Sequence, residues 1–149
     1  MKIENELKQS KFQSNVHKAV VNIMFTNSWL EDQFRQVFKN YKITSQQYNV
    51  LRILRGKYPD SLNPSEIKEV MLDKNPDLTR LCDRLLNMDY IDRCVDAANK
   101  RKMNIRINET GMEVLRKIDP IIFELNKVKF NLTEDEAMIL SDLLDKMRG

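Results

Sequence analysis

Residues 63–111 of this chain, NPSEIKEVMLDKNPDLTRLCDRLLNMDYIDRCVDAANKRKMNIRINETG, decide the fold. The stretch opens with Asn63-Pro64-Ser65-Glu66, which supplies a capping side chain, a proline at the first helical position and a reciprocal acid. Asn75-Pro76-Asp77 repeats the cap and the proline further along. The stretch therefore predicts two consecutive helices joined by a short turn.

Two short strands are predicted after the second helix, over residues 90–95 and 103–107, because their apolar residues alternate or cluster. From Asn99 to Arg106 there are four cations and no acid; the cations are Lys100, Arg101, Lys102 and Arg106. A charge run of this kind, standing alone, is usually a solvated face. At a hairpin directly after two helices it indicates the wing of a winged helix-turn-helix, which points to duplex DNA as the partner.

A long amphipathic helix is predicted before this stretch. From about Ser10 to Tyr41 there is no glycine or proline, and apolar residues recur at intervals of three and four. At 1.5 Å per residue, roughly thirty residues would reach about 45 Å, longer than the globule needs. A helix that extends beyond its own domain usually packs against a partner.

Three further helices are predicted from capping patterns. One opens at Thr44, one runs from Asn108 to about Phe130 and contains Pro120, and the last opens at Thr133. The apolar residues of the last helix are expected to face inward; they are Ala137, Leu140, Leu143, Leu144 and Met147. The predicted protein is mainly α with a small β-hairpin wing.

Composition narrows the class of protein. A chain of 149 residues fits one domain, and its net charge of +3 does not by itself argue for a nucleic-acid partner. With one histidine, no glycine-rich phosphate loop and no metal-ligand spacing around Cys82 and Cys94, we expect no enzyme activity, no cofactor and no metal site. No apolar stretch approaches the roughly 18 residues needed to span a bilayer. Without a signal-peptide pattern either, the expected location is the cytoplasm.

The layout and several motifs resemble the MarR family of bacterial transcriptional regulators. The likeness extends over nearly the whole chain, 1–149, as a single MarR-like domain. Its markers are TSQQYNVL at 44–51, LTRLCDRL at 78–85, YIDR at 90–93, DAANKR at 96–101 and INETG at 107–111. Their order and spacing together, rather than any single motif, make the resemblance specific.

The resemblance implies an intertwined helical homodimer that binds a pseudo-palindromic operator, as a repressor. Residues 10–42 and 109–149 would form the helical dimerisation region, and residues 43–108 the winged helix-turn-helix. The helix from Pro76 would enter the major groove and the wing the minor groove. The resemblance also implies that many members release DNA on binding a small aromatic effector or on cysteine oxidation.

The chain departs from the family pattern at three places. The wing has Asn99 followed by two cations where the family usually has an acid, and residues 1–40 lack the thiol of peroxide-sensing members. Asp89 replaces the usual glycine after the second helix. Aspartate is among the few residues that tolerate a left-handed turn, so the turn itself is still expected.

Four candidates for DNA contact lie on the second helix of the pair. Thr79 is near the helix start, where base edges are usually met, and Arg80 and Arg84 lie on the face that the motif presents to the groove. Alternatively, Arg80 could pair with Asp77, and Arg84 could be simply solvated. Asp77 could accept a hydrogen bond from a cytosine amino group, or could serve only as a negative charge at the helix N-terminus.

The remaining DNA candidates belong to the hairpin. Arg101 is expected in a narrow minor groove, whose negative potential attracts arginine, with Lys100 and Lys102 on phosphates. Arg93, at the start of the first strand, is expected in an ion pair or on a phosphate rather than on a base.

Aromatic residues raise the question of an effector pocket. Phe25, Trp29 and Tyr48 are more often core or dimer-interface residues, and a lone histidine such as His17 is more often a packing or hydrogen-bonding group. The family's pocket nevertheless lies where such residues would meet. Two alternatives to an effector-regulated DNA-binding protein remain open. One is a winged-helix protein–protein interaction module without DNA binding, and the other is a DNA-binding protein without an effector.

Overall fold

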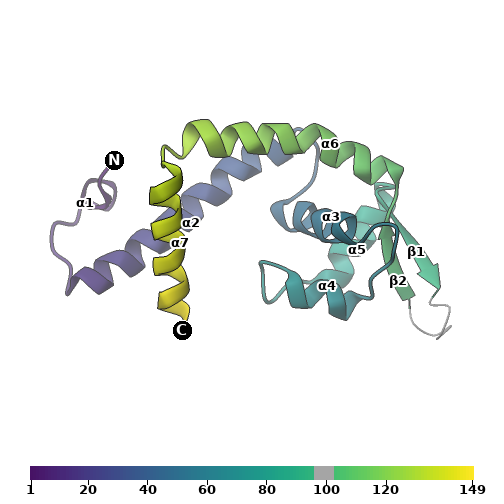
Figure 1. Cartoon of the computed structure of the whole chain (residues 1–149), viewed down its shortest axis with the longest axis horizontal. Coiled ribbons are helices and arrows are strands. Elements are labelled where there is room, and N and C mark those ends of the chain that lie inside the picture. Colours follow the sequence, from purple (N-terminus) through teal and green to yellow (C-terminus); the bar gives the residue numbers. More distant parts are fainter. Residues whose placement is uncertain (96–102) are drawn as a thin grey trace.

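Apart from the short helix α1, which was not predicted, the elements follow the predicted order along the chain (Figure 1). The computed structural model describes residues 1–95 and 103–149. The helices are α1 (Ile3–Glu6), α2 (Asn15–Lys39), α3 (Ser45–Lys57), α4 (Pro64–Val70), α5 (Leu78–Asn87), α6 (Glu109–Glu124), the π-helical turn η1 (Leu125–Lys129) and α7 (Glu134–Arg148). The strands are β1 (Ile91–Val95) and β2 (Met103–Ile107). Within these ranges, no helix is long and apolar enough to cross a bilayer.

Helices α3, α4 and α5 and the β1–β2 hairpin form one compact unit, called here the winged module (45–95 and 103–107). The two strands pair antiparallel, with Ile91 opposite Ile107. Leu62, just before α4, exchanges two backbone hydrogen bonds with Ile105, of 2.9 and 2.8 Å. The hairpin is therefore attached to the segment before α4 by backbone hydrogen bonds at the middle of β2.

The predicted caps at Thr44, Asn63 and Thr133 are all present as reciprocal capping boxes. The asparagine cap predicted from Asn75 is wrong, because α5 begins at Leu78 and its N-cap is Asp77. The backbone N–H of Asn75 instead donates to Asp73 Oδ1 at 2.9 Å, in a local turn that keeps Asn75 and Pro76 outside the helix.

The first long helix is shorter than predicted. It begins at Asn15, where Ser14 Oγ accepts a hydrogen bond from the N–H of His17 at 3.0 Å, and it ends at Lys39. Serine is a strong N-cap residue, so the Ser14 cap starts the helix at Asn15, whereas periodicity alone had predicted a start near Ser10. The separate turn α1 precedes it.

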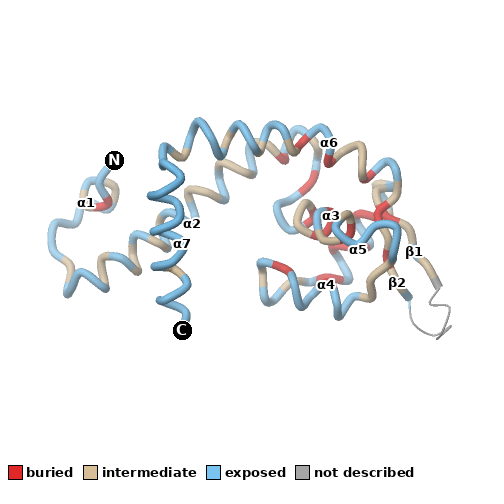
Figure 2. Tube along the Cα trace, viewed as in Figure 1, coloured by how far each residue is buried: buried red, intermediate tan, exposed pale blue. Residues whose placement is uncertain are grey.

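The buried core is concentrated in the winged module (Figure 2). Helix α5 contributes a buried apolar stripe made of Leu78, Leu81 and Leu85. By contrast, α2 buries only Phe38 and α7 buries no residue. The prediction that the α7 apolar residues face inward is therefore wrong for the single chain: Leu140, Leu143 and Met147 are 45%, 58% and 51% exposed.

Two turns around the hairpin depend on special backbone positions. Asp89, directly after α5, has a φ of +57°, as expected for the position that is usually glycine. At Gly111, in the first turn of α6, an added Cβ would overlap the carbonyl oxygen of Tyr90. Glycine at this position therefore lets α6 approach the end of the α5–β1 connection closely.

Both cysteines are free thiols, so no disulfide joins Cys82 to Cys94. Cys82 lies on the buried side of α5 with 6% of its surface exposed. Burial, with a smaller contribution from the charge of Asp83, raises the pKa of the Cys82 thiol to about 11. Cys82 is thus a small buried hydrophobic residue, protonated at neutral pH.

Replacing Gly111 with alanine should destabilise the protein by about 1–3 kcal/mol, because the methyl group would have to push the Tyr90 carbonyl away. Chemical denaturation followed by circular dichroism measures the change. Gly56→Ala is the matched control: nothing lies within 4 Å of its added Cβ in α3, and alanine favours the helix by up to about 1 kcal/mol. Equal stability of the two variants would contradict the close approach at Gly111.

Cys82 should resist alkylation in the native protein, because its thiol is buried and its raised pKa keeps the reactive thiolate scarce at pH 7–8. Iodoacetamide labelling followed by peptide mass spectrometry should modify Cys82 only after denaturant is added. Cys94, which is half-buried, serves as the internal comparison in the same sample. Rapid native labelling of Cys82 would contradict the packing of α5.

Candidate nucleic-acid interface

One side of α5 is a polar, exposed surface opposite the buried apolar stripe. Thr79, Arg80 and Arg84 are all exposed, and the two arginines lie one turn apart on neighbouring positions of the same face. Among the residues that the structure describes, neither arginine has an ion-pair partner (every described ion pair involves other residues). Both guanidinium groups are therefore available to an external anion or hydrogen-bond acceptor.

The start of α3 adds further polar groups to this surface. Arg80 and Arg84 line a shallow hollow of about 210 Å³ together with Asp77 and with Thr44 and Gln46 from α3. Gln46 Nε2 donates to Asp73 Oδ2 at 2.5 Å, which links the start of α3 to the turn before α5. Sequence reasoning missed Gln46, because the cap at Thr44 locates a helix start but not what packs beside it.

Asp77 serves α5 as its N-cap. Its Oδ1 accepts a hydrogen bond from the backbone N–H of Arg80 at 3.1 Å. Asp77 therefore contacts Arg80 through the Arg80 backbone amide. The alternative ion pair between the Asp77 and Arg80 side chains is absent from the described residues. Asp77 thus acts at the N-terminus of α5, which was one of its two predicted roles. Its carboxylate also remains exposed beside the hollow, where the other predicted role, contact with a base, would place it.

Arg93 connects the hairpin to α5. Its Nη2 lies 2.7 Å from Asp83 Oδ1, so β1 is joined by an ion pair to the exposed face of the helix. Both side chains are half exposed, and such a pair contributes little to stability. The ion pair instead determines where the Arg93 side chain lies, because the guanidinium group is bound to Asp83 of the same chain. Lys100, Arg101 and Lys102, the predicted wing contacts, lie outside the described residues.

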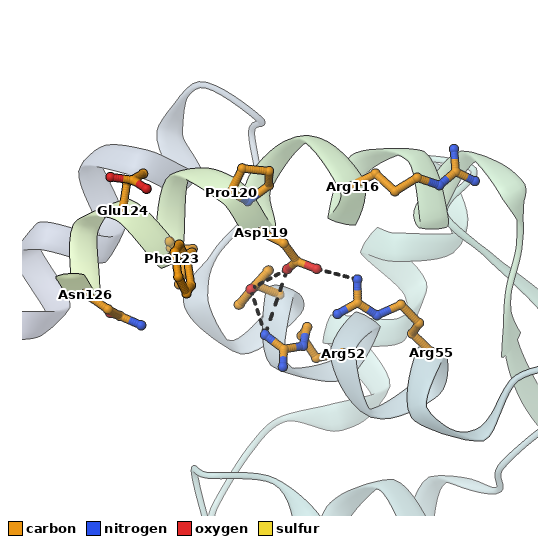
Figure 3. Close-up of a pocket in the computed structure, with 10 residues that line it drawn as sticks. Arg52, Arg55, Arg116, Asp119, Pro120, Phe123, Glu124 and Asn126 are labelled. Atoms are coloured by element: carbon orange, nitrogen blue, oxygen red, sulfur yellow. Dashed lines mark hydrogen bonds and ion pairs between the residues drawn. The ribbon is translucent and has the colours of Figure 1, made fainter. Parts of the chain in front are cut away.

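A second hollow, of about 650 Å³, lies between α3 and α6 (Figure 3). Its centre is Asp119, whose Oδ2 lies 2.5 Å from Arg55 Nη1 and whose Oδ1 accepts from the Tyr48 hydroxyl at 2.9 Å. Arg52 Nη1 donates to the same hydroxyl at 3.0 Å. Burial raises the pKa of Tyr48, so the phenol stays protonated and donates to the carboxylate.

The single chain does not bring the four predicted effector residues together. Tyr48 lines the hollow around Asp119, whereas Phe25 and Trp29 line a separate hollow of about 190 Å³ under α1. His17 lies in neither: its ring packs edge-on against Phe12, with centroids 6.0 Å apart. That these four residues form one effector-binding pocket stays a prediction.

Comparison with known proteins identifies the family. Residues 33–118, more than half of the chain, match the model of the transcriptional regulators SarA/Rot. The chain is 31% identical over 110 residues to the multiple antibiotic resistance protein MarR of Salmonella typhimurium, covering 70% of this chain and 73% of that protein. It is also 26% identical over 84 residues to the regulator PecS of Dickeya dadantii, covering 56% of this chain and 51% of PecS, about half its length.

The fold agrees with these sequence matches. A crystal structure of a MarR mutant from E. coli complexed with operator DNA superposes with a TM-score of 0.78 at 23% identity, covering 93% of this chain and 99% of that one. With 93% of this chain covered, the superposed region includes both the winged module and the long helices α2 and α6. The chain therefore belongs to the MarR family of winged-helix transcriptional regulators.

Proposed function

We propose that this protein binds duplex DNA as a cytoplasmic homodimer and represses transcription from a pseudo-palindromic operator. The observation that carries the proposal is the exposed face of α5, where Arg80 and Arg84 stand one turn apart without an ion-pair partner in the described residues. Arginine donates in a planar fork that matches guanine edges and phosphates. Two such groups on a helix of a winged module fit the edge of a major groove.

The neighbouring groups support the same orientation. Thr79 lies in the first turn of α5 and is exposed beside Arg80, where it can contact a base or a phosphate. Thr44 and Gln46, at the start of α3, line the same hollow and add polar side chains beside the arginines. Arg93, engaged with Asp83, holds the hairpin against the helix rather than reading a base.

The wing completes the proposed interface on sequence grounds alone. Lys100 and Lys102 would neutralise phosphates, and Arg101 would enter the minor groove. Residues 43–108 would thus form the DNA-binding region, and residues 10–42 and 109–149 the dimerisation region.

The proposed dimer follows from apolar surface that the single chain leaves uncovered. An open groove of about 720 Å³ runs between α2 and α7 and is lined mainly by apolar side chains. Leu143, 58% exposed, lies on it together with Val16, 71% exposed. Exposed apolar surface of this extent favours association, and a second copy supplies identical helices for a symmetric contact.

A small aromatic effector is a further part of the proposal. Phe25 and Trp29 are separated from Tyr48 in the single chain, so one pocket containing them, with His17, would require the partner subunit or a rearrangement. Thermal stabilisation by aromatic acids would support an effector, and its absence across a broad panel would favour a regulator without one.

Arg80→Ala and Arg84→Ala should each weaken binding to the preferred duplex by about 1–3 kcal/mol if the side chain reads a base, and weaken random duplex much less. The preferred duplex is obtained by selection from a random library, and fluorescence anisotropy at fixed salt gives the affinities. Arg35→Ala is the control, since Arg35 is an exposed arginine on α2, paired with Asp32.

Equal losses on preferred and random duplexes would show that the two arginines contact phosphates. A parent protein that binds neither duplex would contradict DNA binding itself and favour the protein–protein interaction module.

Leu143→Lys should raise the dimer dissociation constant by at least about 100-fold, because burial of a leucine contributes about 1.5–3 kcal/mol and a symmetric interface contains the site twice. Sedimentation over a concentration series measures the change. Asp142→Lys is the matched control: it also introduces a lysine on α7, but Asp142 does not line the groove. A parent protein that stays monomeric and folded at micromolar concentration would contradict the proposed assembly.

A further inference from the structure

Helix α6 passes from one packing environment to another within a single turn. Leu115 belongs to the core of the winged module, whereas Ile118 packs with Phe38 of α2 and Ile43 in a separate cluster. Beyond η1, Phe130 contacts Trp29 of α2, with ring centroids 5.7 Å apart. The segment around residues 118–119 is therefore where the winged module is joined to the long helices (Figure 1).

Asp119 lies at this junction, and within residues 1–95 and 103–149 its carboxylate pairs with side chains of α3 alone. Arg55 Nη1 is 2.5 Å from its Oδ2, and the Tyr48 hydroxyl donates to its Oδ1 at 2.9 Å. Arg52, whose Nη1 is 3.9 Å from the same Oδ1, completes the set (Figure 3). Each carboxylate oxygen thus has its own partner, from side chains on successive turns of one helix.

Tyr48 extends the junction to α2. Its ring packs against Phe38, with centroids 4.8 Å apart, while its hydroxyl is bound to Asp119. One α3 side chain thus contacts both long helices. Apolar contacts are non-directional and permit sliding, but a carboxylate held at both oxygens fixes how α6 is rotated against α3.

No other described ion pair joins the winged module to the long helices. Arg116, one turn before Asp119, pairs with Glu109 and Glu113 of its own helix. Arg93 and Asp83 both lie inside the winged module. Asp119 therefore carries the directional electrostatic link between the two parts, as far as residues 1–95 and 103–149 are concerned.

We infer that Asp119 is a positioning residue that sets the separation at which two half-sites can be read. The inference rests on the proposed DNA-binding dimer. Because α5 packs against α3, the angle between α3 and α6 determines where Arg80 and Arg84 stand relative to the dimerising helices. Two-fold symmetry applies this angle in both subunits, so the partner is a duplex with one defined spacing.

The test compares operators that differ only in spacing. One added base pair moves a half-site by about 3.4 Å and rotates it by about 34°. The parent protein should discriminate against duplexes with one base pair added or removed. Asp119→Asn, which keeps the shape but removes the charge, should reduce that discrimination about fivefold or more. Its preference among half-site sequences at the optimal spacing should be unchanged, because α5 itself is unaltered.

Three further single variants and one double variant make the result specific. Arg116→Gln breaks ion pairs within α6 only and should keep the parent's spacing preference. Arg55→Gln should act like Asp119→Asn, and the double variant should be no worse than the stronger single one, because both remove the same contact. Tyr48→Phe keeps the ring against Phe38, removes only the hydroxyl, and should show an intermediate loss of discrimination.

Each outcome has one meaning. Unchanged spacing discrimination in Asp119→Asn, or an equal loss of affinity at every spacing, would overturn the inference while leaving DNA binding intact. A parent protein that binds no duplex would instead overturn the proposed function on which the inference rests. If Asp119→Asn does not fold, as judged by its melting curve, Tyr48→Phe decides in its place, and unchanged discrimination there counts against the inference.

Discussion

The packing of the apolar side of α5 into the winged module determines what its other side presents. Leu81 and Leu85 are buried one turn apart, and each adjoins an arginine in sequence. Because neighbouring helical residues point about 100° apart, burying the leucines turns Arg80 and Arg84 toward the surface. The ion pair between Arg93 and Asp83 places a hairpin side chain against the same exposed face of α5.

Burial is distributed unevenly between the two parts of the molecule. The winged module has a continuous core, whereas α7 contributes no buried residue and α2 contributes only Phe38. An amphipathic helix is stabilised mainly by packing of its apolar face, so α7 is poorly supported by its own chain. Helix α6 completes the core of the winged module through Leu115 and then leads, by way of η1, to the uncovered helix α7. It therefore connects the well-packed winged module to helices whose apolar faces stay exposed.

Local sequence predicted the elements that depend on neighbours within a few residues. The capping boxes at Thr44, Asn63 and Thr133 each involve a side chain and a backbone group three positions apart, so they could be recognised without the fold. The start of α5 was misplaced because Asn75 and Asp77 are both competent caps. The choice between them came from Asp73, whose carboxylate accepts the Asn75 amide and closes a turn before the helix.

Only the tertiary structure decided which polar groups meet. Tyr48 and Asp119 are 71 positions apart, and nothing near either residue indicates a partner. The aromatic residues predicted to share a pocket were likewise separated, because a pattern of aromatics does not specify which helices face one another. The sequence by itself therefore determined the winged fold and the exposed arginines of α5, since periodicity and caps act locally. The Asp119 junction and the uncovered α7 surface arose from helix packing, which joins residues distant along the chain.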